Sequence, residues 1–209
     1  VPPARMHADE VDTDADLVRH LLSTQLPQWA DLPVERVSSA GTDNAIYRLG
    51  DDFARRLPRI VCAVDLVAKE QAWLPQLAPQ LPLRVPLPVA TGEPDEAFPY
   101  PWGVVEWLQG EVASLDRLDD PVGAARDLAG FVGALRRIDP AGGPRHRRGR
   151  PLRLGDELVR GGIARLDRVP DTEAITDAWE RAVAAPDHDG PPVWFHGDLS
   201  YLNLLAAEG

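Results

Sequence analysis

The sequence predicts an α+β protein with two lobes, because short strand-like segments come first and longer helical segments follow. Between residues 34 and 57, short β-like runs are separated by breaks rich in Gly, Ser and Asp, as in an antiparallel sheet. From residue 119 onward, apolar residues recur at helical spacing. We place the boundary near Gly110, with an N-terminal lobe over residues 1–109 and a C-terminal lobe over residues 110–209.

The same patterns predict the individual elements. A helix over residues 14–26 has Leu17, Val18, Leu21 and Leu22 on one face and ends before Pro27. A tight turn at Gly50 and Asp51 joins two strands. We expect strands around 34–37, 45–49 and 53–57, within 83–94 and 100–111, and before the terminal loop at 193–195, and helices over 64–77, 119–139, 155–166 and 172–185.

The helix over residues 119–139 has the clearest signals. Asp119 or Asp120 is suited to cap its N-terminus, and Pro121 is suited to its first turn. Its spacing predicts a buried stripe made of Leu128, Val132, Leu135 and Ile138.

Composition and charge limit the classes of partner. Lys and Arg number 22 against 33 Asp and Glu, which gives a net charge of −11. This balance argues against nucleic acid and is compatible with a cationic small molecule. No apolar run reaches the roughly 20 residues of a membrane span, and the acidic start differs from a signal peptide. Cys62 is the only cysteine, which excludes an intrachain disulfide and fits a reducing cytoplasm. We also expect a monomer.

A basic segment over residues 145–153 is the strongest challenge to a small-molecule partner. It holds Arg145, Arg147, Arg148, Arg150 and Arg153. Such a run can bind nucleic acid or other anions. Because no aromatic residue is interleaved with it and the chain is acidic, we interpret it as a solvated loop or a loop that borders the substrate.

The segment HGDLSYLN, from His196 to Asn203, carries the chemistry. Its spacing H-x-D-x-x-x-x-N is that of the protein-kinase catalytic loop, apart from the Arg of H-R-D. Phosphoryl transfer to an alcohol needs a carboxylate beside the attacking hydroxyl, and Asp198 fits this role. It also needs a neutral oxygen ligand for magnesium, which the Asn203 amide supplies. Gly197 allows the loop to turn tightly.

His196 has two interpretations. With Asp198 it could bind a metal, as in metal-dependent hydrolases. That site needs further ligands, and the other four histidines lie in unpatterned sequence. We therefore expect His196 to brace the catalytic loop through hydrogen bonds.

The segment FHGDLSYLNLL resembles the signature of the aminoglycoside phosphotransferase family. The resemblance covers about residues 34–205. SSAGTDNAIYRLGDDFARRLPR is similar to the family's nucleotide-positioning loop and hairpin, KEQAWLPQL to its first-lobe helix, and WGVVEWLQGE to its hinge. The resemblance implies a two-lobed, protein-kinase-like fold.

The resemblance also implies roles for matching positions. Arg56 takes the place of the strand lysine that contacts the phosphates, and strand alternation turns Arg55 to the opposite face. Taken alone, the loop at residues 41–44 could equally be an ordinary turn between strands. The two arginines would then be exposed strand residues, and Glu70 would be a solvated helix residue. The implied nucleotide contacts are Gly41, Thr42, Asp43 and Asn44 in the phosphate loop, Arg56, Glu70 as the partner that orients Arg56, and the backbone of Glu106 and Leu108 in the hinge.

The implied activity is transfer of the γ-phosphoryl group of ATP or GTP, with Mg²⁺, to a hydroxyl of a small polycationic molecule. An aminoglycoside or a basic peptide antibiotic would be such an acceptor, and antibiotic resistance would be the role. Three alternatives stay open. They are a metabolite kinase of the same fold, a nucleotide-binding fragment without turnover, and a metal-dependent hydrolase built on His196 and Asp198.

The resemblance further implies that the helical lobe is incomplete. The family carries a second magnesium ligand, an Asp in an I-D-[WF]-G-like segment, shortly after the N-L-L. This sequence reads NLLAAEG and stops, and Glu208 has no context to replace that Asp. We therefore expect the 209 residues to be part of a longer protein and to show little magnesium-dependent transfer by themselves.

Overall fold

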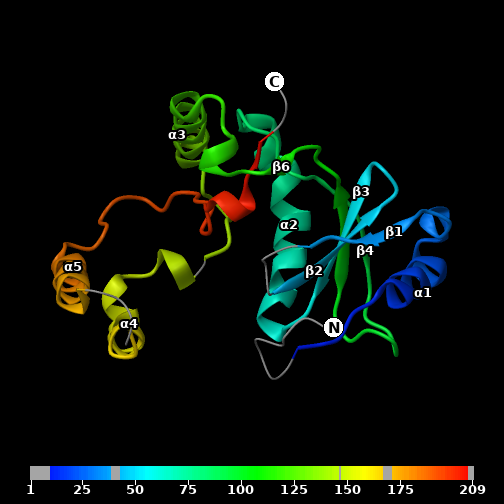
Figure 1. Ribbon diagram of the computed structural model, residues 1–209, viewed down its shortest axis with the longest axis horizontal. Helices are drawn as coiled ribbons and strands as arrows, with labels where there is room; N and C mark the ends of the chain where they lie inside the picture. The colour runs from blue at the N-terminus through cyan, green and yellow to red at the C-terminus, as the bar shows by residue number, and fades with distance from the viewer. Residues whose placement is uncertain (1–9, 39–42, 146, 167–170, 207–209) are drawn as a thin grey trace. The chain divides into compact units, whose positions relative to one another are not determined.

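The computed structural model describes residues 10–38, 43–145, 147–166 and 171–206 (Figure 1). The chain forms two compact units. The first comprises Val1–Asp139 and Trp194–Gly209, and the second comprises Pro140–Val193. This division groups residues by compactness and does not test the lobe boundary expected near Gly110, which stays a prediction. The mixture of an antiparallel sheet and helices confirms the α+β class.

The first unit is built on a five-stranded antiparallel sheet in the order β1-β2-β3-β5-β4. The β2–β3 hairpin pairs Asn44 with Pro58 at one end and Leu49 with Phe53 at the other. Gly50 has a φ of 56° in the connecting turn, a conformation that glycine adopts at little cost. The strands are β1 (Val34–Arg36), β2 (Asn44–Leu49), β3 (Phe53–Pro58), β4 (Pro88–Gly92) and β5 (Trp102–Glu106).

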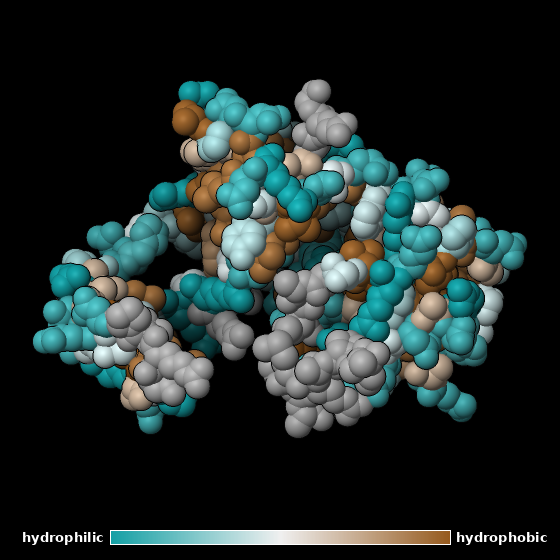
Figure 2. Space-filling model, viewed as in Figure 1, coloured by the Kyte–Doolittle hydropathy of each residue, from teal (hydrophilic) through white to brown (hydrophobic). Residues whose placement is uncertain are grey.

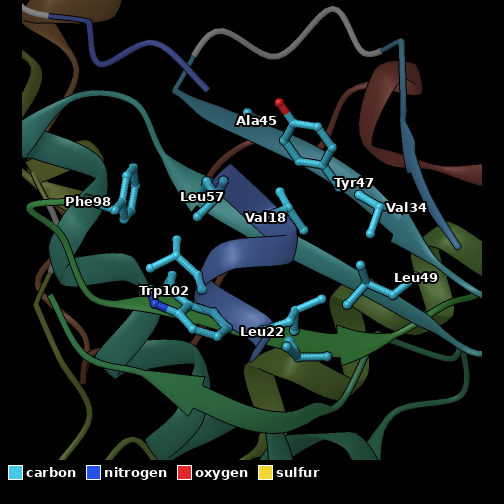
Figure 3. Close-up of a cluster of buried hydrophobic side chains, with 11 residues drawn as sticks. Val18, Leu22, Val34, Ala45, Tyr47, Leu49, Leu57, Phe98 and Trp102 are labelled. Carbon is cyan, nitrogen blue, oxygen red and sulfur yellow. The ribbon is translucent and has the colours of Figure 1, made fainter. Parts of the chain in front are cut away.

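Helix α1 (Ala15–Gln25) covers one face of this sheet and forms the core with it (Figure 3). The Asp14 side chain caps the helix by accepting a hydrogen bond from the Leu17 N–H at 2.8 Å. The predicted apolar face is confirmed in its main part, because Val18, Leu21 and Leu22 are fully buried. Phe98 comes from the loop between β4 and β5. The strands contribute Val34, Ala45, Tyr47, Leu49, Leu57, Trp102 and Val104.

Helix α2 (Val64–Leu77) covers the opposite face of the sheet (Figure 1). A Cβ built on Gly103 of β5 would lie 3.7 Å from Val67 Cγ1, so strand and helix approach closely there. The bounds of α2 are those predicted from the sequence. This helix therefore brings its side chains to the sheet face that α1 does not cover.

Helix α3 (Pro121–Arg137) is capped by Asp120, whose side chain accepts a hydrogen bond from the Gly123 N–H at 2.9 Å. The predicted buried stripe is partly wrong. Val132 is exposed, and Phe131 and Ala134 are buried instead, because the helix packs through a face offset by one residue. The expected strand at 193–195 is also wrong. The paired strands in this region are β6 (Glu111–Val112) and β7 (Leu205–Ala206).

The second unit contains α4 (Asp156–Ile163) and α5 (Thr172–Ala184). Asp156 Oδ1 accepts from Trp179 Nε1 at 2.7 Å and from Arg160 Nε at 2.9 Å, which joins the two helices. No described residue of this unit is buried. The short 3₁₀ segments of the chain are η1 (Pro27–Trp29), η2 (Val61–Ala63), η3 (Ala78–Gln80), η4 (Leu115–Arg117), η5 (Arg147–Gly149), η6 (Leu152–Gly155) and η7 (Tyr201–Asn203).

Within the described ranges, none of the helices combines the length and the apolar character that crossing a membrane requires.

Candidate functional site

The segment from His196 to Asn203, called the catalytic segment below, folds back on itself in the first unit. Gly197 has a φ of 78°, which places this position in the left-handed region. The Asn203 side-chain amide then donates to the Asp198 carbonyl oxygen at 2.8 Å and to Asp198 Oδ2 at 3.1 Å. The loop thereby brings the carboxylate and the amide of the motif together.

His196 contacts the loop and α3. Its Nδ1 accepts a hydrogen bond from the Asp198 N–H at 3.3 Å, and its ring meets the edge of Phe131 with centroids 6.4 Å apart. Removal of the ring from water lowers the pKa of His196, and the Asp198 carboxylate acts in the opposite direction. A neutral imidazole that accepts at Nδ1 agrees with the bracing role expected for it.

The catalytic segment suits magnesium better than a transition metal. Because the Asn203 amide nitrogen donates to Asp198, the amide oxygen is left as the atom that can bind a cation. Magnesium keeps several waters and needs only one or two protein oxygens beside phosphate. Among the described residues, no group of three or more His, Cys, Asp or Glu side chains could hold a metal ion. Within the described ranges, His196 and Asp198 are thus not joined by the further side chains that a hydrolytic metal centre uses.

Arg56 of β3 and Glu70 of α2 form an ion pair on the α2 side of the sheet. Arg56 Nη1 donates to Glu70 Oε1 at 2.6 Å, and the two side chains are 29% and 26% exposed. Burial raises the pKa of Glu70, although Arg56 lowers it through charge and hydrogen bonding. The arrangement fixes a guanidinium in a partly buried position, where it can meet an anion.

The other predicted nucleotide contacts are only partly described. Gly41 and Thr42 lie outside the described residues. Asp43 accepts a backbone hydrogen bond from the Arg59 N–H at 2.8 Å, and Asn44 begins β2. This bond ties Asp43 to the residue that follows β3.

In the hinge, the Glu106 N–H donates to the Leu87 carbonyl at 2.8 Å. This bond occupies the Glu106 N–H, so of its two backbone polar groups the carbonyl oxygen is the candidate for a purine. Leu108 follows β5 by two residues in an irregular segment. Hydrogen bonding of either residue to a nucleotide stays a prediction.

A pair of tryptophans that the sequence analysis did not assign connects the two parts of the site. Trp73 of α2 and Trp194 have ring centroids 5.0 Å apart, with planes inclined by 55°. Trp194 Nε1 also donates to the Asp139 carbonyl at 3.1 Å. Trp73 follows Glu70 by three residues, so these two side chains lie on neighbouring turns of α2. This spacing was the only feature of the sequence that could have indicated a role for Trp73.

Arg55 lies on the opposite face from Arg56, as strand alternation predicts. It is fully buried, its Nη1 donates to the Val18 carbonyl at 2.9 Å, and its Cζ lies 3.6 Å from the centroid of the Trp102 ring. Burial lowers the pKa of Arg55 to about 9, opposed by the charges of Asp95 and Tyr47. Its Nε and Nη2 have no hydrogen-bond partner within the described part of the chain. Arg55 therefore belongs to the core and not to the candidate site.

Several apolar side chains of the catalytic segment and its surroundings are exposed in the first unit. Tyr201 is 63% exposed, and Leu202 is 46% exposed. Figure 2 shows brown, apolar surface in the region where α3 and the catalytic segment lie. The other exposed apolar side chains of the catalytic segment and its surroundings are Val112, Val132, Phe195, Leu199 and Leu205.

Two other features stand apart from these residues. An open hollow of about 660 Å³ is lined by His20, Thr24, Gln25, Asp95, Glu96 and Ala97, and contains none of the predicted site residues. The basic segment lies in the second unit, where Arg153 pairs with Asp187 and Arg145, Arg148 and Arg150 are exposed. These exposures agree with a solvated loop.

Comparison with known proteins adds a family and a fold. The model of the phosphotransferase enzyme family matches residues 34–209. No curated protein matches the chain significantly in sequence.

Solved structures share the fold at low sequence identity. The GDP and kanamycin complex of APH(2")-IIia is 23% identical with a TM-score of 0.71, and covers 91% of this chain and 67% of its own. The GDP complex of wild-type aminoglycoside 2'-phosphotransferase-IIIa is 22% identical with a TM-score of 0.72, with coverages of 93% and 68%. Macrolide 2'-phosphotransferase MphH from Brachybacterium faecium is 22% identical with a TM-score of 0.62, with coverages of 92% and 68%. The chain thus spans about two thirds of the length of these proteins, whose kinase-like fold it shares.

Proposed function

The chain belongs to the phosphotransferase enzyme family, and from this premise we propose that it transfers the γ-phosphoryl group of ATP or GTP to a hydroxyl of a small molecule. The hydrogen bond between Asn203 and Asp198 carries the proposal. It holds a carboxylate and an amide oxygen in one loop, and phosphoryl transfer requires both kinds of group.

In this proposal, Asp198 orients the acceptor hydroxyl and receives its proton as the oxygen attacks phosphorus. The Arg56 guanidinium contacts phosphate oxygens of the nucleotide, and Glu70 holds Arg56 through the 2.6 Å hydrogen bond. His196 keeps the loop in shape through its bond from the Asp198 N–H. The backbone from Gly41 to Asn44 and the hinge residues Glu106 and Leu108 complete the nucleotide contacts.

Asn203 would hold Mg²⁺ through its amide oxygen, together with phosphate oxygens. The nucleotide supplies the phosphoryl group, and a bound Mg²⁺ would neutralise the negative charge of the phosphate oxygens. The hard oxygen donors of the catalytic segment fit this ion, since Mg²⁺ requires few protein ligands when phosphates are present.

We propose a cationic, hydroxyl-rich acceptor, and an antibiotic-resistance role would follow from such an acceptor. The net charge of −11 favours a cation through the overall field of the protein. Kanamycin and macrolide appear in the names of structures that share the fold, which makes both compound classes suitable for a first screen. A metabolite kinase is the alternative that such a screen would detect.

The test is a screen for nucleotide consumption with ATP and with GTP, with and without Mg²⁺. Aminoglycosides, basic peptide antibiotics, macrolides and small metabolite alcohols would be the acceptors. Because the chain spans about two thirds of the length of the proteins that share its fold, the screen uses a form extended at the C-terminus. In this form we expect acceptor-dependent release of nucleoside diphosphate that the Asp198→Asn variant loses. Nucleotide binding without release for any acceptor would favour a binding module, and metal-dependent hydrolysis without nucleotide would refute the phosphotransferase assignment.

A further inference from the structure

We propose that Trp73 and Trp194 are positioning residues that couple the Arg56–Glu70 ion pair to the catalytic segment. The proposal rests on the proposed function, because it concerns how one magnesium nucleotide is held by both parts of that site. It assigns a role to two residues that touch neither the phosphates nor the acceptor in the scheme above.

The contact joins two segments that are far apart in the sequence. The ring centroids lie 5.0 Å apart at an inclination of 55°, which is within the range of favourable aromatic pairs. The Trp194 indole is fixed on its other side, because its Nε1 donates to the Asp139 carbonyl. Both side chains are half-buried, so their mutual contact is part of the packing of the first unit.

Each tryptophan is directly connected to one part of the site. Trp73 is one helical turn beyond Glu70 in α2, so the same rigid helix carries the indole and the carboxylate that holds Arg56. Trp194 is two residues before His196, which accepts from the Asp198 N–H and packs on Phe131. The Trp contact therefore joins the helix that carries Glu70 to the chain segment that leads into His196 and Asp198.

The expected consequence is specific to a ligand that touches both parts. A nucleotide without metal is held by Arg56, the phosphate loop and the hinge, whereas Mg²⁺ adds Asn203 as a ligand. The second attachment strengthens binding only if the two parts are held at the correct separation. Loss of the Trp contact should thus reduce the gain in affinity from Mg²⁺ and leave metal-free binding nearly unchanged.

The experiment measures the dissociation constants of ATP and GTP, with and without Mg²⁺, for the 209-residue protein and its Trp73→Leu variant. Leucine keeps an apolar side chain on α2 but removes the aromatic pair. We expect the affinity gain from Mg²⁺ to fall by roughly two- to thirteen-fold, the range that corresponds to the coupling of an aromatic pair. The Trp73→Phe variant should recover part of this gain, because it restores an aromatic ring.

A matched control is available elsewhere in the same unit. Trp29 and Phe53 also have ring centroids 5.0 Å apart and are half-buried, but they pack against the α1 core. The Trp29→Leu variant should lower the midpoint of thermal unfolding without changing the affinity gain from Mg²⁺. A double-mutant cycle with Trp194→Phe should show that the effects of Trp73 and Trp194 are not additive. Exciton-coupled circular dichroism of the two indoles reports on the contact without any nucleotide.

The outcomes separate the two proposals. Failure of the wild-type protein to bind either nucleotide would refute the proposed function and, with it, this coupling. Nucleotide binding with a magnesium gain that Trp73→Leu retains would refute the coupling alone. An equal loss in Trp29→Leu would also refute it, since the effect would then be a general consequence of lower stability. If Trp73→Leu does not fold, Trp73→Phe and Trp194→Phe decide, because additive effects would refute the coupling.

Discussion

Replacement of Glu70 by glutamine should separate nucleotide affinity from stability. The Glu70→Gln substitution keeps the shape of the side chain and removes its charge. In the wild-type protein, Glu70 Oε1 accepts from Arg56 Nη1 at 2.6 Å, with less than a third of either side chain exposed. Burial raises the pKa of Glu70 more than Arg56 lowers it. Ionised Glu70 is therefore not a source of stability, because removing it from water costs more than pairing returns.

The sign of this effect sets the pH dependence of stability. Because the folded-state pKa of Glu70 is raised above 4.5, its contribution is fully present below pH 4.5 and is lost as the pH rises through the folded value. At pH 7 the Glu70→Gln variant should thus unfold within about 1 kcal/mol of the wild-type free energy.

Nucleotide affinity should respond differently. A hydrogen bond to a charged partner is worth about 1 to 1.5 kcal/mol more than a neutral one, so Arg56 becomes less firmly held. The affinity for nucleotide should fall by roughly five- to twelve-fold. On acidification, the wild-type affinity should approach that of the variant at a pH above 4.5, as Glu70 becomes protonated.

The assay pairs chemical denaturation with nucleotide titration at pH 7 and at lower pH. Asp51→Asn is the control, since Asp51 pairs with Arg48 at 2.8 Å but is 91% exposed in the hairpin turn. This control should change neither quantity. A Glu70→Gln variant that is destabilised by more than 2 kcal/mol yet binds nucleotide normally would show that Glu70 is structural, and the reasoning above would be refuted.

Three further predictions concern other residues. In a form extended at the C-terminus, Asp198→Asn should leave the nucleotide dissociation constant nearly unchanged and slow transfer by about 10²–10⁴-fold in single-turnover measurements, and wild-type turnover would remove Asp198 from the mechanism. Arg55→Met should leave the thermal midpoint unchanged or raise it, because it removes a buried charge whose Nε and Nη2 find no partner among the described residues; a large decrease would show that the contacts to Val18 and Trp102 outweigh burial. The lowered pKa of His196 gives stability that is present above pH 6.5 and is lost as the pH falls from there toward the folded value. His196→Gln should therefore flatten the pH dependence of unfolding in this window, and an unchanged profile would show that the pKa of His196 is the same in the folded and unfolded states.

Local patterns predicted the elements that position the site. The bounds of α2 and the β2–β3 hairpin follow from apolar spacing and from a turn that needs Gly50, and both are properties of short segments. Glu70 was expected to meet Arg56 from the family resemblance, and the ion pair is present. The helix over 64–77 alone would not have indicated it, because a helical Glu beside apolar residues is equally suited to solvent.

Contacts between distant segments were not predictable from these patterns. The stripe on α3 was expected to include Val132, but the helix buries Phe131, which meets His196 across 65 residues of sequence. The face that a helix buries depends on what covers it, and apolar residues on both sides of α3 fit the period. The contact between Trp73 and Trp194 has the same origin, since neither segment identifies its partner.

The adjacent arginines of β3 show how packing decides which residue serves the site. A shift of one residue in the register would turn Arg55 toward α2 and Arg56 toward α1, so the arginines themselves do not select a register. Leu57 is fully buried on the α1 side, and Phe53 packs on Trp29 there. The shifted strand would remove Leu57 from the α1 core, where full burial of such a side chain is worth about 1.5 to 3 kcal/mol. The hydrophobic core on one face of the sheet therefore determines that Arg56, and not Arg55, meets Glu70 on the other.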